Sequence, residues 1–472
     1  MKKLLFLFVL FLFVGCKDDL DDNVQVPTTR NLEIEDFVYK AMNYVYYWQK
    51  DVPNLADDLF SNDKEYTSFI QSFKGPEELF DDLQYKDDRF SVITDDYINL
   101  EKQLNSISLS NGMKFGLGRI SSTDSDLFGY VRYVLPNTDA TQKGIKRGDI
   151  FTHVDGSQLT IENYESLLFA NKTSYTLSMA TISNLTIQST GTTVTLNNSE
   201  LTEKELHISK VIEHDGKKVG YVMYNGFASK QEDDLKNVFT NLASQQIDEL
   251  VVDLRYNPGG SVSTSQLLAG LIAGEHAGKV FGEMVYNEKL ARYNEEIEII
   301  DSGIRLGLSR VIFLVTSGSA SASEMMINGL NPYMDVVLIG NKTYGKNVGS
   351  FIVYDYIDDK QTKNPNHTWA LLPITFGIFN SIGFGDYGDG FSPNNELNED
   401  LENLGILGNI DEPFLRRALD FISGKVSSTS SFTTNSVKLP FNEIQIEEGR
   451  AIYTPTCVLI YSRNKKNEYK GT

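Results

Sequence analysis

The sequence predicts an α/β core joined to a β-rich module and a small N-terminal helical region. Between about residues 205 and 425, short apolar runs typical of buried strands alternate with stretches of helical periodicity. Between about 105 and 198, short strands are punctuated by glycines, whereas residues 31–100 have the apolar spacing of helices. At 472 residues the chain has room for two to four domains of roughly 100–200 residues each.

The N-terminus has the pattern of an export signal. Two lysines precede an apolar run over residues 4–14, which is far shorter than the ~20 residues of a membrane-spanning helix. The run ends in FVGC, which resembles a lipobox, so we expect removal of residues 1–15 and lipidation of Cys16. The alternative is an ordinary secretory signal followed by an incidental cysteine.

Charge and cysteine content restrict the partners and the compartment. The net charge of -21 opposes binding to polyanions, so nucleic acid is not an expected partner. The only other cysteine is Cys457, so no disulfide scaffold is predicted. Residues 16–30 are predicted to be a tether, in which the acidic run KDDLDD directly follows Cys16. This run resembles the surface-export signals of some Gram-negative lipoproteins. We therefore expect an envelope protein held by a lipid at Cys16, in the outer membrane and facing the periplasm or the cell surface.

The helical region at 31–100 gives no indication of its function. A helix is predicted from Asn31, which is a suitable cap, with acidic residues in the first turn and an apolar face that extends to Trp48. Pro53 is expected to end this helix.

The module at 105–198 resembles a PDZ domain over its whole length. The resemblance lies in FGLGRI at 115–120, the KGIKRGD turn at 143–149 and a helix at 161–170. A PDZ domain accepts an extended peptide as an added strand and captures its terminal carboxylate with backbone N–H groups. The alternative is a β-rich spacer that binds no ligand. The resemblance places the carboxylate-binding residues in a strand-entry loop formed by Phe115, Gly116, Leu117 and Gly118.

The segment TSGSASASEMMINGL at 316–330 lies where a buried strand is expected to meet a helix. A serine hydroxyl at such a junction lies near unpaired helix N–H groups, which favour a developing negative charge. Each serine in the segment could instead be an ordinary helix cap. The four candidates are Ser317, Ser319, Ser321 and Ser323.

Two further motifs follow other predicted strands. YGKNVG at 344–349 would come to the same edge of the sheet as the serine segment, and DLRYNPGG at 253–260 ends in paired glycines suited to an oxyanion pocket. In this order, the three motifs make residues 205–425 resemble the carboxyl-terminal processing, or tail-specific, serine peptidases, which implies crotonase-like βα repeats. The resemblance implies that Ser321 is the nucleophile, that Lys346 is the general base, and that Gly259 or Gly260 with the Ala322 amide forms the oxyanion hole.

A lysine base must be neutral to accept the proton of Ser321. Its pKa therefore has to fall from ~10.4 toward ~7, a change that burial can supply. Many members of the family carry a glutamine four residues after the lysine, where this chain has Ser350. Ser350 is thus the candidate for orienting Lys346, with a shorter reach than glutamine.

Other chemistries fit the sequence less well. The segment at 340–346 superficially matches a phosphate-binding loop, but Asn347 follows where a Ser or Thr should bind magnesium. The five histidines lie outside any recognisable triad context, closely spaced zinc ligands are lacking, and no cofactor or metal is predicted. The segment at 383–405 resembles the closing stretch of the peptidase family, and its acidic residues are expected in a solvated loop. Residues 426–472 are predicted to be a linker and a C-terminal tail.

The function that follows is hydrolysis of proteins recognised by their free C-terminal tails. The alternative is a peptide-binding lipoprotein whose peptidase core is weak or inactive. A polysaccharide-binding surface protein has only the lipoprotein context in its favour.

Overall fold

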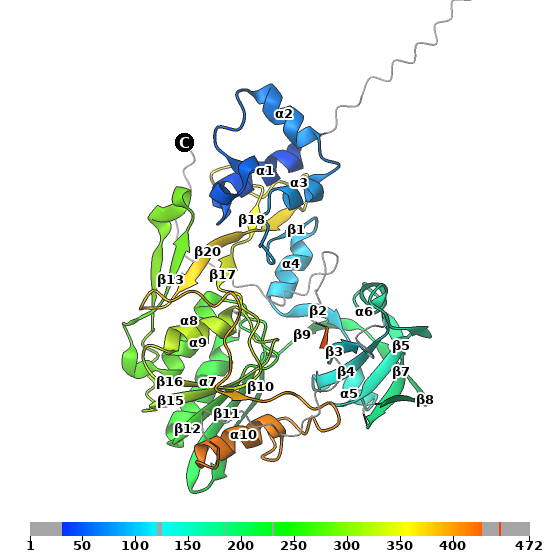
Figure 1. Ribbon diagram of the computed structural model, residues 1–472, viewed down its shortest axis with the longest axis vertical. Coiled ribbons are helices and arrows are strands. Elements are labelled where there is room, and N and C mark those ends of the chain that lie inside the picture. Colours follow the sequence, from blue (N-terminus) through cyan, green and yellow to red (C-terminus); the bar gives the residue numbers. More distant parts are fainter. Residues whose placement is uncertain (1–30, 120–124, 185, 229–230, 427–442, 445–472) are drawn as a thin grey trace, which may run out of the picture.

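The computed structural model describes residues 31–119, 125–184, 186–228, 231–426 and 443–444. Figure 1 shows a helical region at one end, an α/β core below it, and a separate β-module, residues 105–198, beside the core. The predicted signal peptide and Cys16 lie outside the described residues, as does most of the tail at 426–472. Across the described ranges, no helix combines the length and apolar character needed to cross a bilayer.

The core is built on a six-stranded sheet with the strand order β10-β11-β12-β15-β16-β21. β10 is antiparallel to β11, and every later neighbour pairs in parallel. The predicted alternation of strand and helix is confirmed over this region. The strands are β10 (Leu206–His214), β11 (Lys217–Tyr224), β12 (Glu249–Asp253), β15 (Arg310–Val315), β16 (Asp335–Gly340) and β21 (Asn395–Glu396).

Helices cover both faces of this sheet, which is why its central strands β12 and β15 are buried along almost their whole length. One set of alternating strand residues, including Val252 and Phe313, packs with α7 (Glu232–Ser244), α8 (Val262–Ile272) and α9 (Ala322–Leu330). The other set, including Val251 and Ile312, packs against α10 (Pro413–Ile422), which crosses the opposite face (Figure 1).

Two smaller sheets extend the core toward the helical region. A four-stranded sheet has the order β14-β13-β20-β17, and a three-stranded sheet has the order β1-β19-β18. Their elements are β1 (Val92–Thr94), β13 (Val280–Tyr286), β14 (Glu295–Glu298), β17 (Val348–Ser350), β18 (Val353–Tyr354), β19 (Ala370–Leu372) and β20 (Ile374–Phe379), with the 3₁₀ turns η3 (Gly274–His276) and η4 (Glu288–Tyr293).

The N-terminal region is joined to the core through β1. Its hydrophobic cluster includes Val348, Leu371 and Ile374 from the core strands, so the two parts share one packed interior. The prediction that the first helix extends to Trp48 was wrong: the helix ends at Val45, and the following aromatic residues pack in irregular backbone. The elements are α1 (Glu33–Val45), η1 (Gln49–Asp51), η2 (Pro53–Leu55), α2 (Asp63–Gln71), α3 (Pro76–Asp82) and α4 (Tyr97–Leu104).

The β-module contains one large sheet with the order β22-β3-β4-β5-β7-β8, and β6 pairs with β5. A separate antiparallel pair, β2 with β9, lies where the module meets the core. The elements are β2 (Ile107–Ser110), β3 (Met113–Arg119), β4 (Leu127–Val134), α5 (Asp139–Gln142), β5 (Ile150–Val154), β6 (Ser157–Gln158), α6 (Tyr164–Leu168), β7 (Ser174–Ser183), β8 (Thr186–Asn197), β9 (Ser199–Thr202) and β22 (Glu443–Ile444).

The four residues predicted to form a strand-entry loop do not form one. Phe115, Gly116, Leu117 and Gly118 lie inside β3 and pair with β4. Gly116 faces the ring of Tyr130 and Gly118 the ring of Phe128; an added Cβ would lie 2.4 Å and 2.7 Å from these rings. Glycine is therefore needed at these two positions of β3 because aromatic rings from β4 lie directly against them.

Candidate active site

Ser321 lies at the turn between β15 and α9, at the N-terminus of the helix. It is 1% exposed and has a φ of 56°, a conformation that residues with a side chain rarely adopt. Strained backbone of this kind is frequent at active sites because the surrounding structure must hold it in place. The turn thus presents Ser321 at the carboxyl edge of the parallel strands.

The neighbouring serines have structural roles, unlike Ser321. The hydroxyl of Ser319 donates to the Leu254 carbonyl at 2.7 Å, and that of Ser323 donates to the Asn257 carbonyl at 2.9 Å. The Ser321 Oγ is buried and donates to no group among the described residues; with Glu324 it forms the capping box at the start of α9. The hydroxyls of Ser319 and Ser323 therefore hold the turn to the loop after β12, whereas the hydroxyl of Ser321 does not.

The loop after β12 approaches Ser321 so closely that only glycine fits. A Cβ at Gly259, which has a φ of 110°, would lie 2.7 Å from the Cβ of Ser321 and 3.0 Å from the Ala322 nitrogen. The N–H of Gly259 already donates to the Oδ1 of Asn257 at 2.9 Å. Gly260 comes next in this loop, beside Phe227. The structure thus brings the predicted oxyanion residues Gly259 and Ala322 together.

Glu324 connects the serine turn with the loop that carries Lys346. Its Oε2 accepts the N–H of Ser321 at 2.9 Å and the N–H of Lys346 at 2.8 Å. Its Oε1 accepts the N–H of Gly345 at 2.7 Å and the hydroxyl of Thr343 at 2.6 Å. Burial raises the pKa of Glu324, and these four hydrogen bonds oppose the rise. No role was predicted for Glu324 from the sequence.

Lys346 is 2% exposed, and its surroundings come partly from the N-terminal region. The Nζ atom lies 4.7 Å from the centre of the Phe90 ring. Arg89 donates to the carbonyl of Gly345 at 2.9 Å, and the same guanidinium nitrogen donates to the carbonyl of Gly388 at 3.2 Å. The helical region therefore forms one wall around the predicted lysine base. No function was predicted for this region from the sequence.

Ser350 is buried in β17, whose first residue Val348 belongs to the cluster shared with the N-terminal region. Its role in orienting Lys346 stays a prediction. The residues predicted to bind a peptide carboxylate, in β3, belong to the β-module and not to the serine turn.

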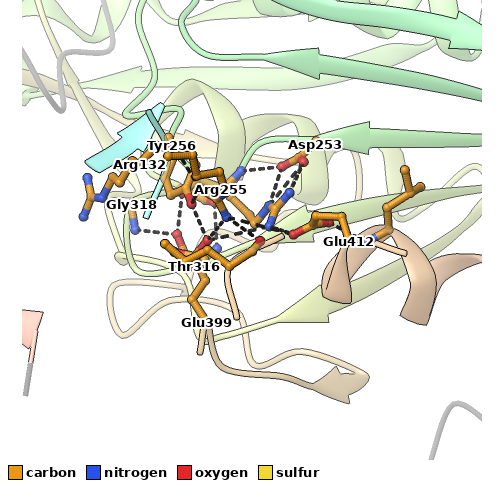
Figure 2. A network of polar contacts seen from close by, with 12 residues as sticks. Arg132, Asp253, Arg255, Tyr256, Thr316, Gly318, Glu399 and Glu412 are labelled. Atoms are coloured by element: carbon orange, nitrogen blue, oxygen red, sulfur yellow. Dashed lines mark hydrogen bonds and ion pairs between the residues drawn. The ribbon is translucent and has the colours of Figure 1, made fainter. Parts of the chain in front are cut away.

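A buried ionic network lies behind the loop after β12 (Figure 2). Arg255 is fully buried and donates to Asp253 at 2.7 Å and to Glu412 at 2.6 Å. Its backbone carbonyl accepts the hydroxyl of Thr316, which precedes the serine turn. A buried charge is costly unless it is paired, so the contacts of Arg255 are not easily broken. Through them the network holds β12, the serine turn and α10 together.

The β-module joins the same network through Arg147. Arg147 donates to the hydroxyl of Tyr256 at 2.7 Å and to Glu399 at 2.8 Å, and Tyr256 also donates to Glu399. Glu399 had been expected in a solvated loop; that expectation was wrong, because its side chain is only 14% exposed. Burial alone would raise the pKa of Glu399, but Arg147 and Arg255 lower it overall.

Comparisons with known proteins agree with this arrangement. The model of peptidase family S41 matches residues 218–360, and the model of the S41 N-terminal domain matches residues 33–92. A solved structure of a putative S41 protease from Bacteroides fragilis is 28% identical, with a TM-score of 0.66; the match covers 83% of this chain and 98% of that one.

Two curated relatives match over shorter stretches. The chain is 27% identical over 218 residues to carboxyl-terminal-processing peptidase 3, chloroplastic, of Arabidopsis thaliana, covering 44% of this chain and 40% of that protein. It is 23% identical over 266 residues to a probable CtpA-like serine protease of Staphylococcus saprophyticus, covering 56% of this chain and 50% of that protein. The chain thus spans half or less of the length of these relatives.

The fold and the paired domain matches define a serine-type peptidase architecture. The matches to the two S41 models and the similarity to a carboxyl-terminal-processing peptidase support a serine-type peptidase of that family.

Proposed function

We propose that the chain is a serine endopeptidase that uses Ser321 and Lys346 to hydrolyse proteins recognised by their C-terminal tails. The observation that carries the proposal is the buried hydroxyl of Ser321 at a helix N-terminus, which donates to no group among the described residues. A second observation supports the proposal: the backbone N–H groups of Ser321 and Lys346 bind the same oxygen of Glu324, which holds the two backbone segments close together.

In the proposed reaction, the Oγ of Ser321 attacks the carbonyl carbon of the scissile bond and transfers its proton to neutral Lys346. The N–H of Ala322, at the helix N-terminus, and that of Gly260 stabilise the oxyanion. We favour Gly260 over Gly259 because the Gly259 N–H already binds Asn257. Lys346 then returns the proton to the leaving amine, and water hydrolyses the acyl-enzyme ester to free Ser321 and a new carboxylate.

The β-module is proposed to act as a PDZ-like domain that holds the substrate tail. β3 is proposed for this role because, within residues 105–198, only β4 pairs with it; its other edge pairs with β22 from the C-terminal tail. The tail would add to β3 as a further strand, and backbone hydrogen bonds would supply most of the affinity. Phe115, Gly116, Leu117 and Gly118 lie within β3 and therefore do not form a separate carboxylate-binding loop.

The proposed location is the cell envelope, with the chain anchored by a lipid on Cys16. The support is the sequence alone, namely the apolar run at 4–14 and the lipobox-like FVGC. Mass spectrometry of the mature N-terminus tests this proposal. A lipidated Cys16 is the expected first residue, and an unmodified Cys16 would contradict the anchor.

The activity is tested with a serine-reactive acylating probe on the chain from residue 17 onward. Intact-mass and peptide analysis should find the adduct on Ser321, no adduct in Ser321→Ala, and much slower labelling in Lys346→Ala. A chain that binds peptides but is neither labelled nor able to cleave would support the alternative, a peptide-binding lipoprotein with an inactive core.

A further inference from the structure

The edge of β3 that does not pair with β4 pairs instead with a segment from the C-terminal tail of the same chain. β22 pairs with β3 in antiparallel register, with Glu443 opposite Gly118 and Ile444 opposite Leu117. Among the described residues, β3 has only two neighbours, β4 on one side and β22 on the other. The tail segment therefore takes the position that an added peptide strand would take.

An unpaired sheet edge exposes backbone N–H and C=O groups, which bind an extended strand of almost any sequence. Selectivity comes from the side chains beside the edge. Here the ring of Phe115, on β3, stacks on that of Phe169 at the end of α6, with centres 5.8 Å apart, and both side chains are half-buried. The edge thus combines backbone pairing groups with an apolar border.

The sequence of the tail suits this border. Residues 443–447 read EIQIE, in which polar and apolar residues alternate with the period of a strand. Because β22 (Glu443–Ile444) follows α10 (Pro413–Ile422) in the same chain, it is a tethered ligand and not a free one.

We propose that residues 443–444 are an internal strand ligand that blocks the peptide-binding edge of the chain's own β-module. A substrate tail then binds only after it displaces this segment. The identity of the displaced ligand, a substrate tail, rests on the proposed function. The pairing of β22 with β3 does not depend on that function. A tethered competitor acts at an effective concentration of about millimolar, so occupancy weakens the apparent affinity for a peptide in trans.

The test compares three full-length chains from residue 17, each carrying Ser321→Ala so that a peptide is bound without being cleaved. One has no further change, the second carries Glu443→Pro and Ile444→Pro, which remove the backbone N–H groups of the pair, and the third carries Asn435→Pro and Ser436→Pro as a matched control. The probe is a fluorescent peptide of sequence FNEIQIEE, corresponding to residues 441–448.

We expect the probe to bind the variant at 443–444 at least ~10-fold more tightly than it binds the other two chains, since an internal competitor has been removed. Equal affinity for all three chains, or no binding to any of them, would overturn the proposal.

Hydrogen exchange of the segment 113–119 provides a readout that needs no peptidase activity. Its amides should exchange faster in the variant at 443–444 than in the control, and added probe should restore their protection. Unchanged exchange would overturn the proposal even if the enzyme cleaves substrates. Faster exchange in a chain without peptidase activity would leave it standing while the proposed function fails.

Discussion

Ser321 and Lys346 donate their backbone N–H groups to the same oxygen atom, Oε2 of Glu324. This shared acceptor fixes the relative position of two residues that are distant in the sequence and lie after different strands. Because the carboxylate is buried, its hydrogen bonds are strong and costly to break. Glu324 is therefore the residue that aligns the proposed dyad.

Replacing Glu324 with Gln should reduce both the stability of the fold and the activity of the folded enzyme. Gln has one acceptor oxygen, so two of the four donors around the carboxylate would face an NH₂ group; each buried donor left unsatisfied costs about 1–3 kcal/mol. We expect kcat/KM for a peptide substrate to fall by roughly 100-fold, as expected when reacting groups move by about 1 Å. Steady-state kinetics and the rate of probe labelling at Ser321 measure this effect.

The matched control is Thr343→Ser, which keeps the hydroxyl that donates to Glu324. It should retain nearly full activity. If Glu324→Gln cleaves and labels as fast as this control, the carboxylate does not align the dyad.

Phe90 should contribute to the environment of Lys346 although it belongs to the N-terminal region. The ring lies 4.7 Å from the lysine Nζ, and contacts of this kind are worth about 0.5–2 kcal/mol. Because a cation–π contact favours the protonated amine, its loss in Phe90→Ala should move the pH–rate profile of kcat/KM toward lower pH, which raises the rate on the acidic limb by roughly 2- to 30-fold. Phe90→Tyr keeps the ring and should behave like the unmodified enzyme; a profile for Phe90→Ala that overlays that of Phe90→Tyr would contradict a role for the ring.

Arg147 should link the β-module to catalysis without contacting the substrate at the serine turn. It binds Tyr256, which directly precedes Asn257, and the side chain of Asn257 holds the N–H of Gly259. Arg147→Ala should therefore lower kcat for a short peptide that is too small to reach the β-module. The exposed neighbour Lys146→Ala is the control. Equal short-peptide rates for the two variants would show that the module does not influence the active site.

Glu205 should make stability depend on pH at the junction between the β-module and the core. Burial, with a smaller contribution from Glu203, raises the pKa of Glu205 to about 7. The folded state therefore holds a proton that the unfolded state releases near pH 4.3. The resulting stabilisation is full below about pH 4.3 and is lost as the pH rises through about 7, on the order of 3 kcal/mol.

Thermal unfolding of Glu205→Gln between pH 5 and pH 8.5 tests this dependence. The unmodified chain should lose thermal stability relative to Glu205→Gln as the pH rises. Glu213→Gln, at an exposed position in β10, should leave the dependence unchanged. Parallel curves for the unmodified chain and Glu205→Gln would mean that Glu205 does not titrate in this range.

The core could be predicted because its signals are local. Buried parallel strands such as β12 and β15 produce continuous apolar runs, and the motifs after them come to one edge of the sheet by topology alone. The glycines of β3 show the limit of such reasoning. Gly116 and Gly118 were interpreted as loop residues, but they face Tyr130 and Phe128 across the sheet, and a sequence does not show which strand lies opposite.

Contacts between distant segments could not be predicted either. Arg89 and Gly345 are 256 positions apart, and Arg147 and Glu399 are 252 apart. No periodicity or local motif connects such pairs, so the wall formed by the N-terminal region and the burial of Glu399 appear only in the structure. Glu324 had a usable signal, since a glutamate three residues after a helix-capping serine commonly binds the backbone of the cap.

The most direct test of the account is cleavage of a mixed-sequence peptide library at pH 7 to 9 by the chain from residue 17, compared with Ser321→Ala and Lys346→Ala. We predict cleavage by the unmodified chain and a loss of at least ~10³-fold in both variants, as expected for a nucleophile and its base. Cleavage that survives either substitution, or no cleavage by any of the three, would contradict a Ser321–Lys346 peptidase.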